Sequence, residues 1–418
     1  MAKIQTLRGF RDISGEEIER FRIIEQVSRK YFDLLGLAEI EVPVLERTEL
    51  FVRSIGDTTD IVEKEMFTFT DLGGDSVTLR PEATAGVVRA YLQAGLYAKE
   101  RVSKLFTMGP MFRHEKPQKG RFRQFRQIDV EVFGSSDSLI DADLLWMISL
   151  ILGDLKIANY SIEVNSVGCP RCREDFRGKV ISYFETKKDE LCGDCLRRLY
   201  RNPLRIFDCK HEHCIEVSRQ SPFLFDSLCD SCKDHFDAFL THLNEFGVVV
   251  TVNKRLVRGL DYYTKTVFEF TSGDLGAQRA FIAGGRYDNL VEEMGGPKTP
   301  GTGFAIGMER LAMLSGATIA MRDPVYYFAY VGEKAKKFVI PVLRAFADNG
   351  LSLRYDYEGK SLKSQMRYAD SLKADFVLIL GDDEINRGVV TLRNMKTKAQ
   401  REIPLDPSRM PVEVTKLV

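Results

Sequence analysis

The sequence predicts an α+β fold followed by a separate α/β domain, and two stretches carry this prediction. Met108–Gly134 reads as a strand, a basic loop and a second strand, which is the pattern of an antiparallel hairpin. From Pro324 onward, strand-like runs alternate with helical ones, which is typical of an α/β unit. We place the boundary near Ala317–Asp323, so the expected domains are 1–320 and 324–418.

The composition limits the kind of partner and the location. The chain has 418 residues, 44% of them hydrophobic, and 60 basic residues balance 60 acidic ones. A nucleic-acid partner must therefore be bound by local basic patches rather than by the overall field. The N-terminus lacks the apolar core of a signal peptide, and the longest apolar run, near Leu144–Leu152, is too short to span a bilayer. We expect a cytoplasmic protein with no membrane partner and reduced cysteines.

The N-terminal part alternates helices and strands. Ser14 followed by Glu17 has the spacing of a capping box and predicts a helix that ends at Gly36. The next stretch, AEIEVPVLER, reads as a strand that contains Pro43. Because proline cannot donate to a central ladder, this strand is expected at a sheet edge or at a subunit contact.

A strand-to-helix junction follows in VTLRPEATAGVVRAYL. The strand ends at Arg80-Pro81, and a helix begins near Thr84 with Glu82 beside its positive end. Such a junction suits an ammonium-bearing ligand, and it is equally the pattern of a capped helix. A later segment, Ser138–Leu155, is apolar throughout and reads as a core helix.

The hairpin concentrates positive charge. From Arg113 to Arg126 the chain has six Lys or Arg residues against one acid, so the tip repels itself unless a polyanion binds. Phe125, set among the arginines, suits a base stacked above phosphates. A solvated hairpin is the alternative. The first strand is expected to deliver Arg113 and Glu115. The second strand offers three polar side chains on one face, at Gln127, Asp129 and Glu131.

All eight cysteines fall between Cys169 and Cys232. Two thiols one turn apart can bind the same tetrahedral ion, so the spacing indicates up to two metal sites. The alternatives are reduced cysteines that pack as small apolar residues and, less compatible with the surrounding pattern, a redox pair. The cysteines form four pairs, Cys169/Cys172, Cys192/Cys195, Cys209/Cys214 and Cys229/Cys232, and His211 and His213 lie within the third.

Three further motifs follow the cysteines: RGLDYY (258–263), AGGRYD (283–288) and GFAIGMER (303–310). The first lies on a bend that leads into a strand, and the third leads into a helix that carries Arg310. None of the glycine sets is a GxGxxG or a Walker sequence, which argues against Rossmann and P-loop folds.

With these motifs, the sequence resembles the histidyl-tRNA synthetases of the bacterial type over essentially the whole chain. RGLDYY and AGGRYD are the two signatures particular to that family. The strand around Pro43, the hairpin at 112–125 and GFAIGMER match the three general class II motifs. The resemblance implies the class II antiparallel sheet flanked by helices, a Cys-rich insertion at 168–247 and a C-terminal α/β anticodon-binding domain.

The resemblance also implies the reaction. A histidine–tRNA ligase activates L-histidine with ATP and Mg²⁺ to histidyl-adenylate and transfers it to the 3′ end of tRNA(His). The resemblance further implies a homodimer, which we expect to form through the strand around Pro43. Structural Zn²⁺ on the cysteines is a possibility that the resemblance leaves open, and the chemistry would not depend on it.

Residue roles follow from matching positions. Arg113 and Arg258 are the expected catalytic cations. The ATP site is expected to comprise Arg113, Glu115, Arg121, Phe125 and Arg310. The histidine site is expected to comprise Glu82, Thr84, Gln127, Glu131, Arg258, Tyr262 and Tyr263. A neutral imidazole has one donor and one acceptor, which suits Glu131 on one side and Tyr263 on the other. Lys116 and Gln118 are expected to contact the tRNA acceptor end.

Two other functions compete with this interpretation. A non-catalytic synthetase paralogue that regulates histidine biosynthesis generally lacks the anticodon domain and an intact RGLDYY, and both are present here. A zinc-dependent RNA-binding module would explain the cysteines and basic patches. It would leave Arg113, Arg258 and Arg310 without a common purpose.

Overall fold

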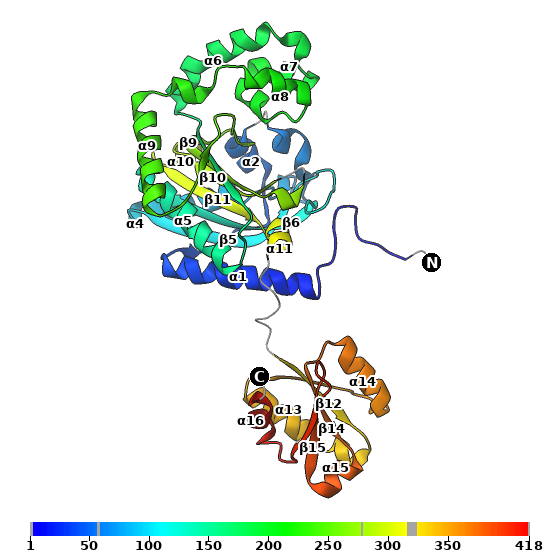
Figure 1. Cartoon of the computed structure of the whole chain (residues 1–418). Helices are drawn as coiled ribbons and strands as arrows, with labels where there is room; N and C mark the ends of the chain where they lie inside the picture. The colour runs from blue at the N-terminus through cyan, green and yellow to red at the C-terminus, as the bar shows by residue number, and fades with distance from the viewer. Residues whose placement is uncertain (1–2, 57–58, 277–278, 316–323, 417–418) are drawn as a thin grey trace. The chain divides into compact units, whose positions relative to one another are not determined.

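The computed structural model describes residues 3–56, 59–276, 279–315 and 324–416 (Figure 1). The chain forms two compact units, Met1–Thr318 and Ile319–Val418. The boundary expected near Ala317–Asp323 lies outside the described residues.

An eight-stranded sheet organises the first unit. Neighbouring strands are antiparallel, except that the outermost pair at each edge is parallel. The predicted antiparallel sheet is confirmed, with these two parallel edge pairs added. In spatial order the strands are β1 (Ala38–Glu39), β5 (Ser103–Phe112), β6 (Gln124–Phe133), β11 (Gly301–Gly307), β10 (Ala280–Arg286), β9 (Thr264–Thr271), β7 (Ser161–Ser166) and β8 (Thr251–Val252).

Four helices cover one face of this sheet. Together with the apolar side chains of that face they form the largest buried cluster. The predicted core helix at 138–155 is one of them. They are α1 (Glu16–Leu34), α5 (Ser138–Asp154), α9 (Asp230–Glu245) and α11 (Met308–Leu314).

Smaller elements border the other face, which stays open at its centre. A three-stranded sheet and short helices pack beside it. The strands are β2 (Leu45–Arg47), β4 (Ser76–Leu79) and β3 (Phe67–Thr70). The helical segments are α2 (Thr48–Ile55), η1 (Ile61–Glu65), α3 (Thr84–Gln93), α4 (Leu96–Lys99) and α10 (Leu290–Glu293), whereas η5 (Gly273–Leu275) packs on the covered face beside α11.

Two local expectations about the N-terminal part were wrong. Helix α1 begins after Gly15, which has a φ of 59° and offers no side chain, so the capping box of Ser14 and Glu17 does not form. Glu17 instead binds Arg11 through a hydrogen bond of 2.6 Å from Nη1. The stretch AEIEVPVLER is not one strand, because Pro43 cannot donate to a ladder and separates edge strand β1 from β2 in the smaller sheet.

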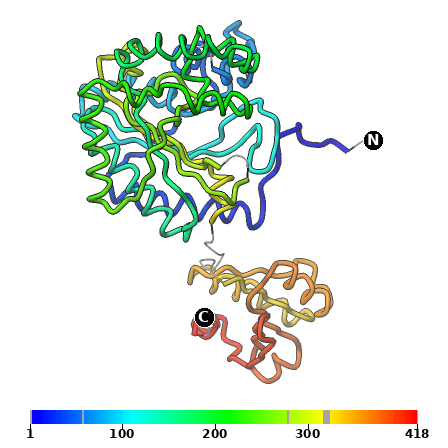
Figure 2. The backbone as a smooth tube through the Cα atoms, turned by 45° about the horizontal axis from the view of Figure 1, so that its top comes forward, coloured from blue at the N-terminus to red at the C-terminus, as the bar shows by residue number. Residues whose placement is uncertain are grey.

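The insertion between β7 and β8 is helical. Figures 1 and 2 both show it, in green, gathered at one end of the first unit. It contains α6 (Pro170–Glu185), η2 (Lys188–Glu190), α7 (Gly193–Arg201), η3 (Pro203–Asp208), α8 (Glu212–Arg219) and η4 (Leu224–Ser227), and α9 returns the chain to the sheet.

The second unit is the predicted α/β domain. Its five-stranded sheet has the order β13-β12-β14-β15-β16, with β12 parallel to both neighbours and the last two pairings antiparallel. The strands are β12 (Val325–Tyr330), β13 (Ser352–Tyr355), β14 (Phe376–Leu380), β15 (Val389–Asn394) and β16 (Gln400–Pro404). The helices are α12 (Glu333–Lys336), α13 (Val339–Asp348), α14 (Leu362–Ser371), α15 (Asp382–Arg387) and α16 (Met410–Thr415). Within the described part of the chain, no helix has the length and apolar character needed to cross a membrane.

A buried ion pair ties the AGGRYD strand to the helical layer. Arg286 and Asp141 are both fully buried, and the guanidinium donates two hydrogen bonds to the carboxylate at 3.1 and 3.0 Å. His235 of α9 lies 3.1 Å from the same carboxylate. Burial alone would raise the pKa of Asp141, but the Arg286 charge and the hydrogen bonds outweigh burial and lower that pKa to about 2.

We predict that Asp141→Asn will destabilise the first unit by about 3–5 kcal/mol, because the buried Arg286 charge loses its fully buried counter-ion and keeps only the partly exposed Asp288. The wild-type contribution is present above about pH 4, the unfolded pKa, and is lost as pH falls through the folded value near 2. Asp143→Asn on the same helix is the control, since its pair with Lys104 is partly exposed and should contribute less than about 1 kcal/mol. Denaturant unfolding that gave equal losses for the two variants would contradict this role.

Candidate active site

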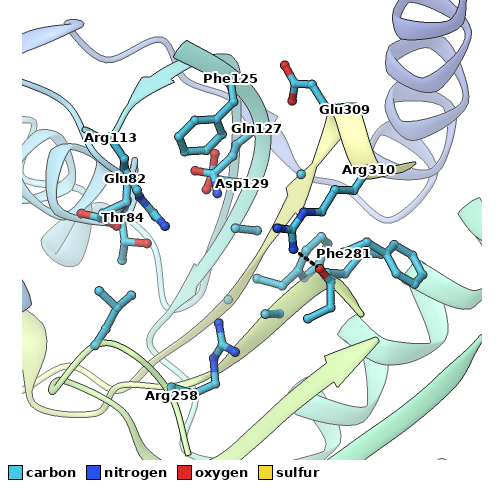
Figure 3. Close-up of a pocket in the computed structure, with 18 of the residues that line it drawn as sticks. Glu82, Thr84, Arg113, Phe125, Gln127, Asp129, Arg258, Phe281, Glu309 and Arg310 are labelled. Carbon is cyan, nitrogen blue, oxygen red and sulfur yellow. Dashed lines mark hydrogen bonds between the residues drawn. The ribbon is translucent and has the colours of Figure 1, made fainter. Parts of the chain in front are cut away.

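A pocket of about 240 Å³ opens on the uncovered face of the large sheet. It lies over β6, β10 and β11 and is bordered by the start of α3 and by the RGLDYY loop (residues 258–263). In Figure 3, Arg113, Arg310 and Arg258 approach the cavity from three different sides. The pocket therefore joins most of the residues that the sequence singled out.

Strand β6 supplies the polar floor of the pocket. Gln127, Asp129 and Glu131 line the cavity, whereas the alternate residues Ile128 and Val130 are in the core beneath α1 and α5. The prediction that the three polar side chains share one face is confirmed. The two-residue period of a strand separates the site from the core in a single element.

The start of α3 adds a third acidic group. The Glu82 carboxylate accepts hydrogen bonds from the backbone N–H groups of Thr84 at 2.8 Å and Ala85 at 2.9 Å. It therefore caps the helix, as one of the two interpretations of this junction proposed. Glu82 also lines the pocket, so the capping role leaves the ligand-binding interpretation open.

Glu131 lies at the centre of a hydrogen-bonded group. Thr84 Oγ1 donates to Glu131 Oε1 at 2.6 Å, and the Tyr287 hydroxyl donates to Oε2. The Tyr262 ring packs against two other tyrosines, with ring centroids 4.7 Å from Tyr263 and 5.6 Å from Tyr287. Tyr287 was not among the predicted ligands, although it lies in AGGRYD, one of the two family signatures.

These carboxylates are buried and close to one another. Glu82, Asp129 and Glu131 are each exposed by 4% or less. Burial raises the pKa of Glu82, and it raises the pKa values of Asp129 and Glu131 well above the ordinary range. Asp129 Oδ2 and Gln127 Oε1 are buried acceptors with no hydrogen-bond donor among the described residues. The floor is thus suited to a ligand that brings donors and positive charge.

Arg113 and Phe125 form one wall of the pocket. The guanidinium lies 5.4 Å from the Phe125 ring centroid, and its Nε donates to the carbonyl of Pro81 at 2.8 Å. Strand β5 ends at Phe112, so Arg113 and Glu115 lie in the loop and not in the strand, contrary to expectation. The ladder ends here because the backbone bonds to other segments, with the His114 N–H donating to the Glu65 carbonyl at 2.7 Å. Glu115 is buried beyond it and forms an ion pair with Arg121.

Arg310 faces this wall from helix α11. Its Nη1 donates to the carbonyl of Ala280 at 2.5 Å, and its side chain reaches the cavity. Lys116 and Gln118, by contrast, do not line the pocket and are exposed on the hairpin loop.

Arg258 enters the pocket from the RGLDYY loop and forms an ion pair with Glu269 of β9. Its guanidinium carbon lies 5.9 Å from the Tyr263 ring centroid. Burial lowers the pKa of Arg258, but the Glu269 charge outweighs this effect, so the side chain stays protonated. The sequence analysis gave no role to Glu269. The only sequence signal was a charged residue within the otherwise apolar strand segment VFEF.

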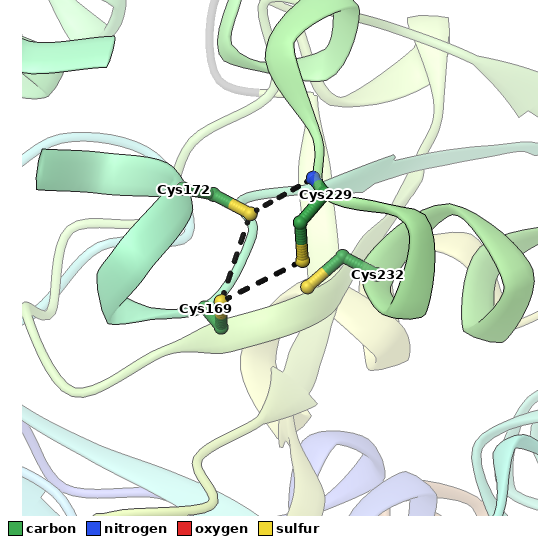
Figure 4. A group of neighbouring side chains, drawn as sticks. All are labelled: Cys169, Cys172, Cys229 and Cys232. Atoms are coloured by element: carbon green, nitrogen blue, oxygen red, sulfur yellow. Dashed lines mark hydrogen bonds between the residues drawn. The ribbon is translucent and has the colours of Figure 1, made fainter. Parts of the chain in front are cut away.

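The cysteines form two groups of four in the insertion. Within each group the sulfur atoms all lie within 4.8 Å of one another. The first and last pairs along the chain combine as Cys169, Cys172, Cys229 and Cys232, which Figure 4 shows facing a common centre. The two middle pairs combine as Cys192, Cys195, Cys209 and Cys214. His211 and His213 belong to neither group.

The sulfur spacing fits a tetrahedral metal ion. The Sγ atoms of Cys169 and Cys172 are 3.6 Å apart, those of Cys169 and Cys229 are 4.0 Å apart, and those of Cys192 and Cys209 are 3.8 Å apart. Four sulfurs at about 2.3 Å from one zinc ion would be separated by about 3.8 Å. The side chains are therefore arranged as two candidate zinc sites.

The chain matches two family models. One, described as histidyl-tRNA synthetase, matches residues 9–171 and 213–311, and the other, described as anticodon binding domain, matches 326–408. The first match is interrupted within the insertion, over 172–212.

Full-length relatives are similar throughout. The histidine–tRNA ligase of Geobacter sulfurreducens is 48% identical over 412 residues, which is 99% of this chain and 100% of the relative. The histidine–tRNA ligase of Desulfosudis oleivorans is 49% identical over 405 residues, which is 96% of each chain.

Solved structures share the fold. The apo histidyl-tRNA synthetase of S. aureus has a TM-score of 0.79 and 31% identity, over 97% of this chain and 98% of that one. A Bacillus halodurans protein described as an ATP phosphoribosyltransferase regulatory subunit/histidyl-tRNA synthetase has a TM-score of 0.66 and 19% identity, over 91% and 98%. At that identity the second likeness extends to the fold alone.

Proposed function

The chain belongs to the histidyl-tRNA synthetase family and charges tRNA(His) with histidine, and from this premise we propose which residues perform each step. ATP, with Mg²⁺, is a substrate of such a ligase. The observation that carries the proposal is that one pocket joins arginines on its rim to buried carboxylates on its floor. Phosphates fit the first, and an amino acid with an ammonium group and an imidazole fits the second.

ATP binds along the hairpin wall. Phe125 stacks on adenine, and the Arg113 guanidinium beside that ring holds the α-phosphate. Arg310 holds the far phosphates from the opposite side of the cavity, with Mg²⁺ on the β- and γ-phosphates. Glu115 and Arg121 border the adenine side as a pair. Guanidinium groups suit this role because they match phosphate oxygens in pairs and stay charged.

Histidine binds on the floor. Its ammonium donates to Glu82, Thr84 and Gln127, and Asp129 adds a further buried carboxylate at the same place. Its neutral ring donates to Glu131 and accepts from the Tyr263 hydroxyl. Tyr287 keeps Glu131 in position through its hydroxyl, and Tyr262 packs against both tyrosines.

The first step is attack of the histidine carboxylate on the α-phosphorus, which forms histidyl-adenylate and releases pyrophosphate. Because two anions approach each other, a fixed cation at the meeting point contributes most. Arg258 supplies this charge, together with Arg113. Glu269 orients Arg258 before substrates arrive and exchanges part of that contact for the reacting anions.

The second step is attack of a ribose hydroxyl of the terminal adenosine of tRNA on the adenylate. The phosphate takes the proton, since no side-chain base is assigned. Lys116 and Gln118, exposed on the hairpin loop, contact the acceptor end. The second unit binds the anticodon. A regulatory paralogue without catalysis is disfavoured by the intact RGLDYY loop in the pocket.

Zinc occupies both cysteine groups in this proposal and has a structural role. Two features support it: the tetrahedral sulfur spacing, and backbone N–H groups of Cys229 and Cys192 that donate to Cys172 and Cys214 sulfurs at 3.2 Å each. Such bonds favour thiolates, which is the state that binds metal.

The chain acts as a homodimer in the cytoplasm, where tRNA charging serves translation. Support for the dimer comes from apolar side chains left exposed around Pro43, with Val44 at 36%, Leu45 at 41% and Phe69 at 49%. Sedimentation of the full chain at two concentrations tests this state.

Arg258→Ala should reduce histidine-dependent ATP–pyrophosphate exchange by ~10²–10³, the usual loss when one preorganised stabilising group is removed. ATP binding should persist, because Arg113 and Arg310 remain. The matched control is Lys254→Ala, an exposed residue of the same segment whose ammonium pairs with Asp226 and lies 5.3 Å from the Phe225 ring centroid, away from the pocket. Exchange by Arg258→Ala within about tenfold of wild type would remove this residue from catalysis.

Exchange with phenylalanine or leucine in place of histidine should be slower by ~10⁴ in kcat/KM. An apolar side chain could not make the proposed ring hydrogen bonds to Glu131 and Tyr263, and sites built around substrate polar groups reject such analogues strongly. Activation of either amino acid at a rate near that of histidine would refute the assignment of the floor to imidazole.

Elemental analysis of protein purified without added metal should find about two zinc ions per chain. Cys169→Ser should remove about one ion and leave the second group loaded, which tests the division into two sites. Less than about a tenth of an equivalent, with all eight thiols reacting freely in the native protein, would reduce the cysteines to packing residues.

A further inference from the structure

We propose that Arg205 of the insertion is a positioning residue for histidine activation, because it holds the RGLDYY loop in place through Asp261. This inference rests on the proposed function in one respect: the RGLDYY loop carries Arg258, Tyr262 and Tyr263. Arg205 itself does not line the active-site pocket, so it acts through the loop and not on substrate.

Arg205 lies in η3, and only 5% of it is exposed. Its Nε donates to Asp261 Oδ1 at 3.2 Å, and its Nη2 donates to the carbonyl of Gly259. One guanidinium thus binds the loop at two points, one side-chain and one backbone. Asn202, at the end of α7, donates from Nδ2 to the same Asp261 Oδ1 at 2.8 Å.

Asp261 is held from other directions as well. Arg173 of α6 donates from Nη1 to the Asp261 carbonyl at 3.4 Å, and the Asp261 N–H donates to the Ile55 carbonyl at 3.3 Å. A methyl group added at Gly56 would come within 2.8 Å of Asp261 Oδ2. The residue is therefore clamped between the insertion on one side and the end of α2 on the other.

The RGLDYY loop depends on such contacts because it has no ladder of its own. Residues 258–263 precede β9 and belong to no helix or strand. Gly259 and Asp261, the two residues that Arg205 binds, alternate with Arg258, Leu260 and Tyr262, which line the pocket. A cavity of about 40 Å³ behind the loop is lined by Arg205 and Arg258 together. A shift of Arg205 would move Gly259, and Gly259 is the direct chain neighbour of Arg258, the proposed catalytic cation.

Each cysteine group anchors one of these contacts. η3 lies between Cys195 and Cys209 of one group, and Arg173 directly follows Cys172 of the other. The insertion is therefore connected to amino acid activation and does not serve tRNA contacts alone. Arg205 lies in residues 172–212, which the family model does not match. The contact between Arg205 and the RGLDYY loop therefore lies partly outside that match.

The test is ATP–pyrophosphate exchange by full-length Arg205→Met, with Arg197→Met as the matched control. Arg197 lies on α7, is exposed and pairs with Asp194. We expect a loss of ~10–100-fold in kcat for Arg205→Met, as small misplacements of reacting groups cause, with an unchanged KM for ATP and zinc content, measured at a temperature where the variant is folded. Arg197→Met should match wild type. Arg205→Lys, which keeps the charge but not the planar fork, should fall between Met and wild type.

A double-mutant cycle separates positioning from general damage. If Arg205 acts through Asp261, then Arg205→Met should cost less than about threefold in an Asp261→Ala background. Asn202→Ala provides a second variant that weakens the same contact should Arg205→Met not fold. The inference is overturned if Arg205→Met stays within about twofold of wild type, or if the two losses simply multiply. Loss in Arg258→Ala but not in Arg205→Met would reject only this inference, whereas full activity in Arg258→Ala would reject the site itself.

Discussion

Three buried carboxylates in one pocket are the constraint on which the rest of the site depends. Glu82, Asp129 and Glu131 carry like charge, and removing them from water is unfavourable unless donors and cations meet them. Helix N–H groups meet Glu82, and hydroxyls meet Glu131. Asp129 has no donor on Oδ2 among the described residues. The apolar residues on the far side of β6 hold Asp129 and Glu131 in place. The floor is therefore suited to a cationic ligand that donates hydrogen bonds to it.

The arginines on the rim of the pocket are positioned by tertiary contacts, whereas the floor is positioned by strand pairing. The floor belongs to a central strand with partners on both sides, and its geometry follows from the ladder. Arg113, Arg258 and Arg310 come from a loop, a bend and a helix, so tertiary contacts must orient each of them. For Arg258 these contacts are Glu269 in front and the clamp on Asp261 behind. If Arg205 positions the loop as proposed, the insertion contributes to chemistry in the pocket.

The sequence predicted whatever depends on local period or on a signature. The alternation along β6, the core helix α5, the α/β pattern after Pro324 and the RGLDYY loop were all readable. It could not predict contacts between distant segments, such as Tyr287 on Glu131, Glu269 on Arg258 or Arg205 on Asp261. The nested order of the cysteine pairs is of the same kind, since spacing does not say which pairs meet. The predicted capping box and the predicted single strand around Pro43 were wrong because one residue decided each boundary: Gly15 precedes α1, and Pro43 separates β1 from β2.

Calorimetry of histidine binding tests the central claim most directly. Burial raises the pKa values of Glu82 and Asp129, and the positive charge of an incoming ammonium should lower them again, so histidine binding should displace protons from the floor. Titrations at pH 7 in buffers of different ionisation enthalpy count these protons. The account predicts a net release of protons when histidine binds. Binding without net proton exchange, or with proton uptake, would contradict a floor of buried carboxyls that the ligand's charge completes.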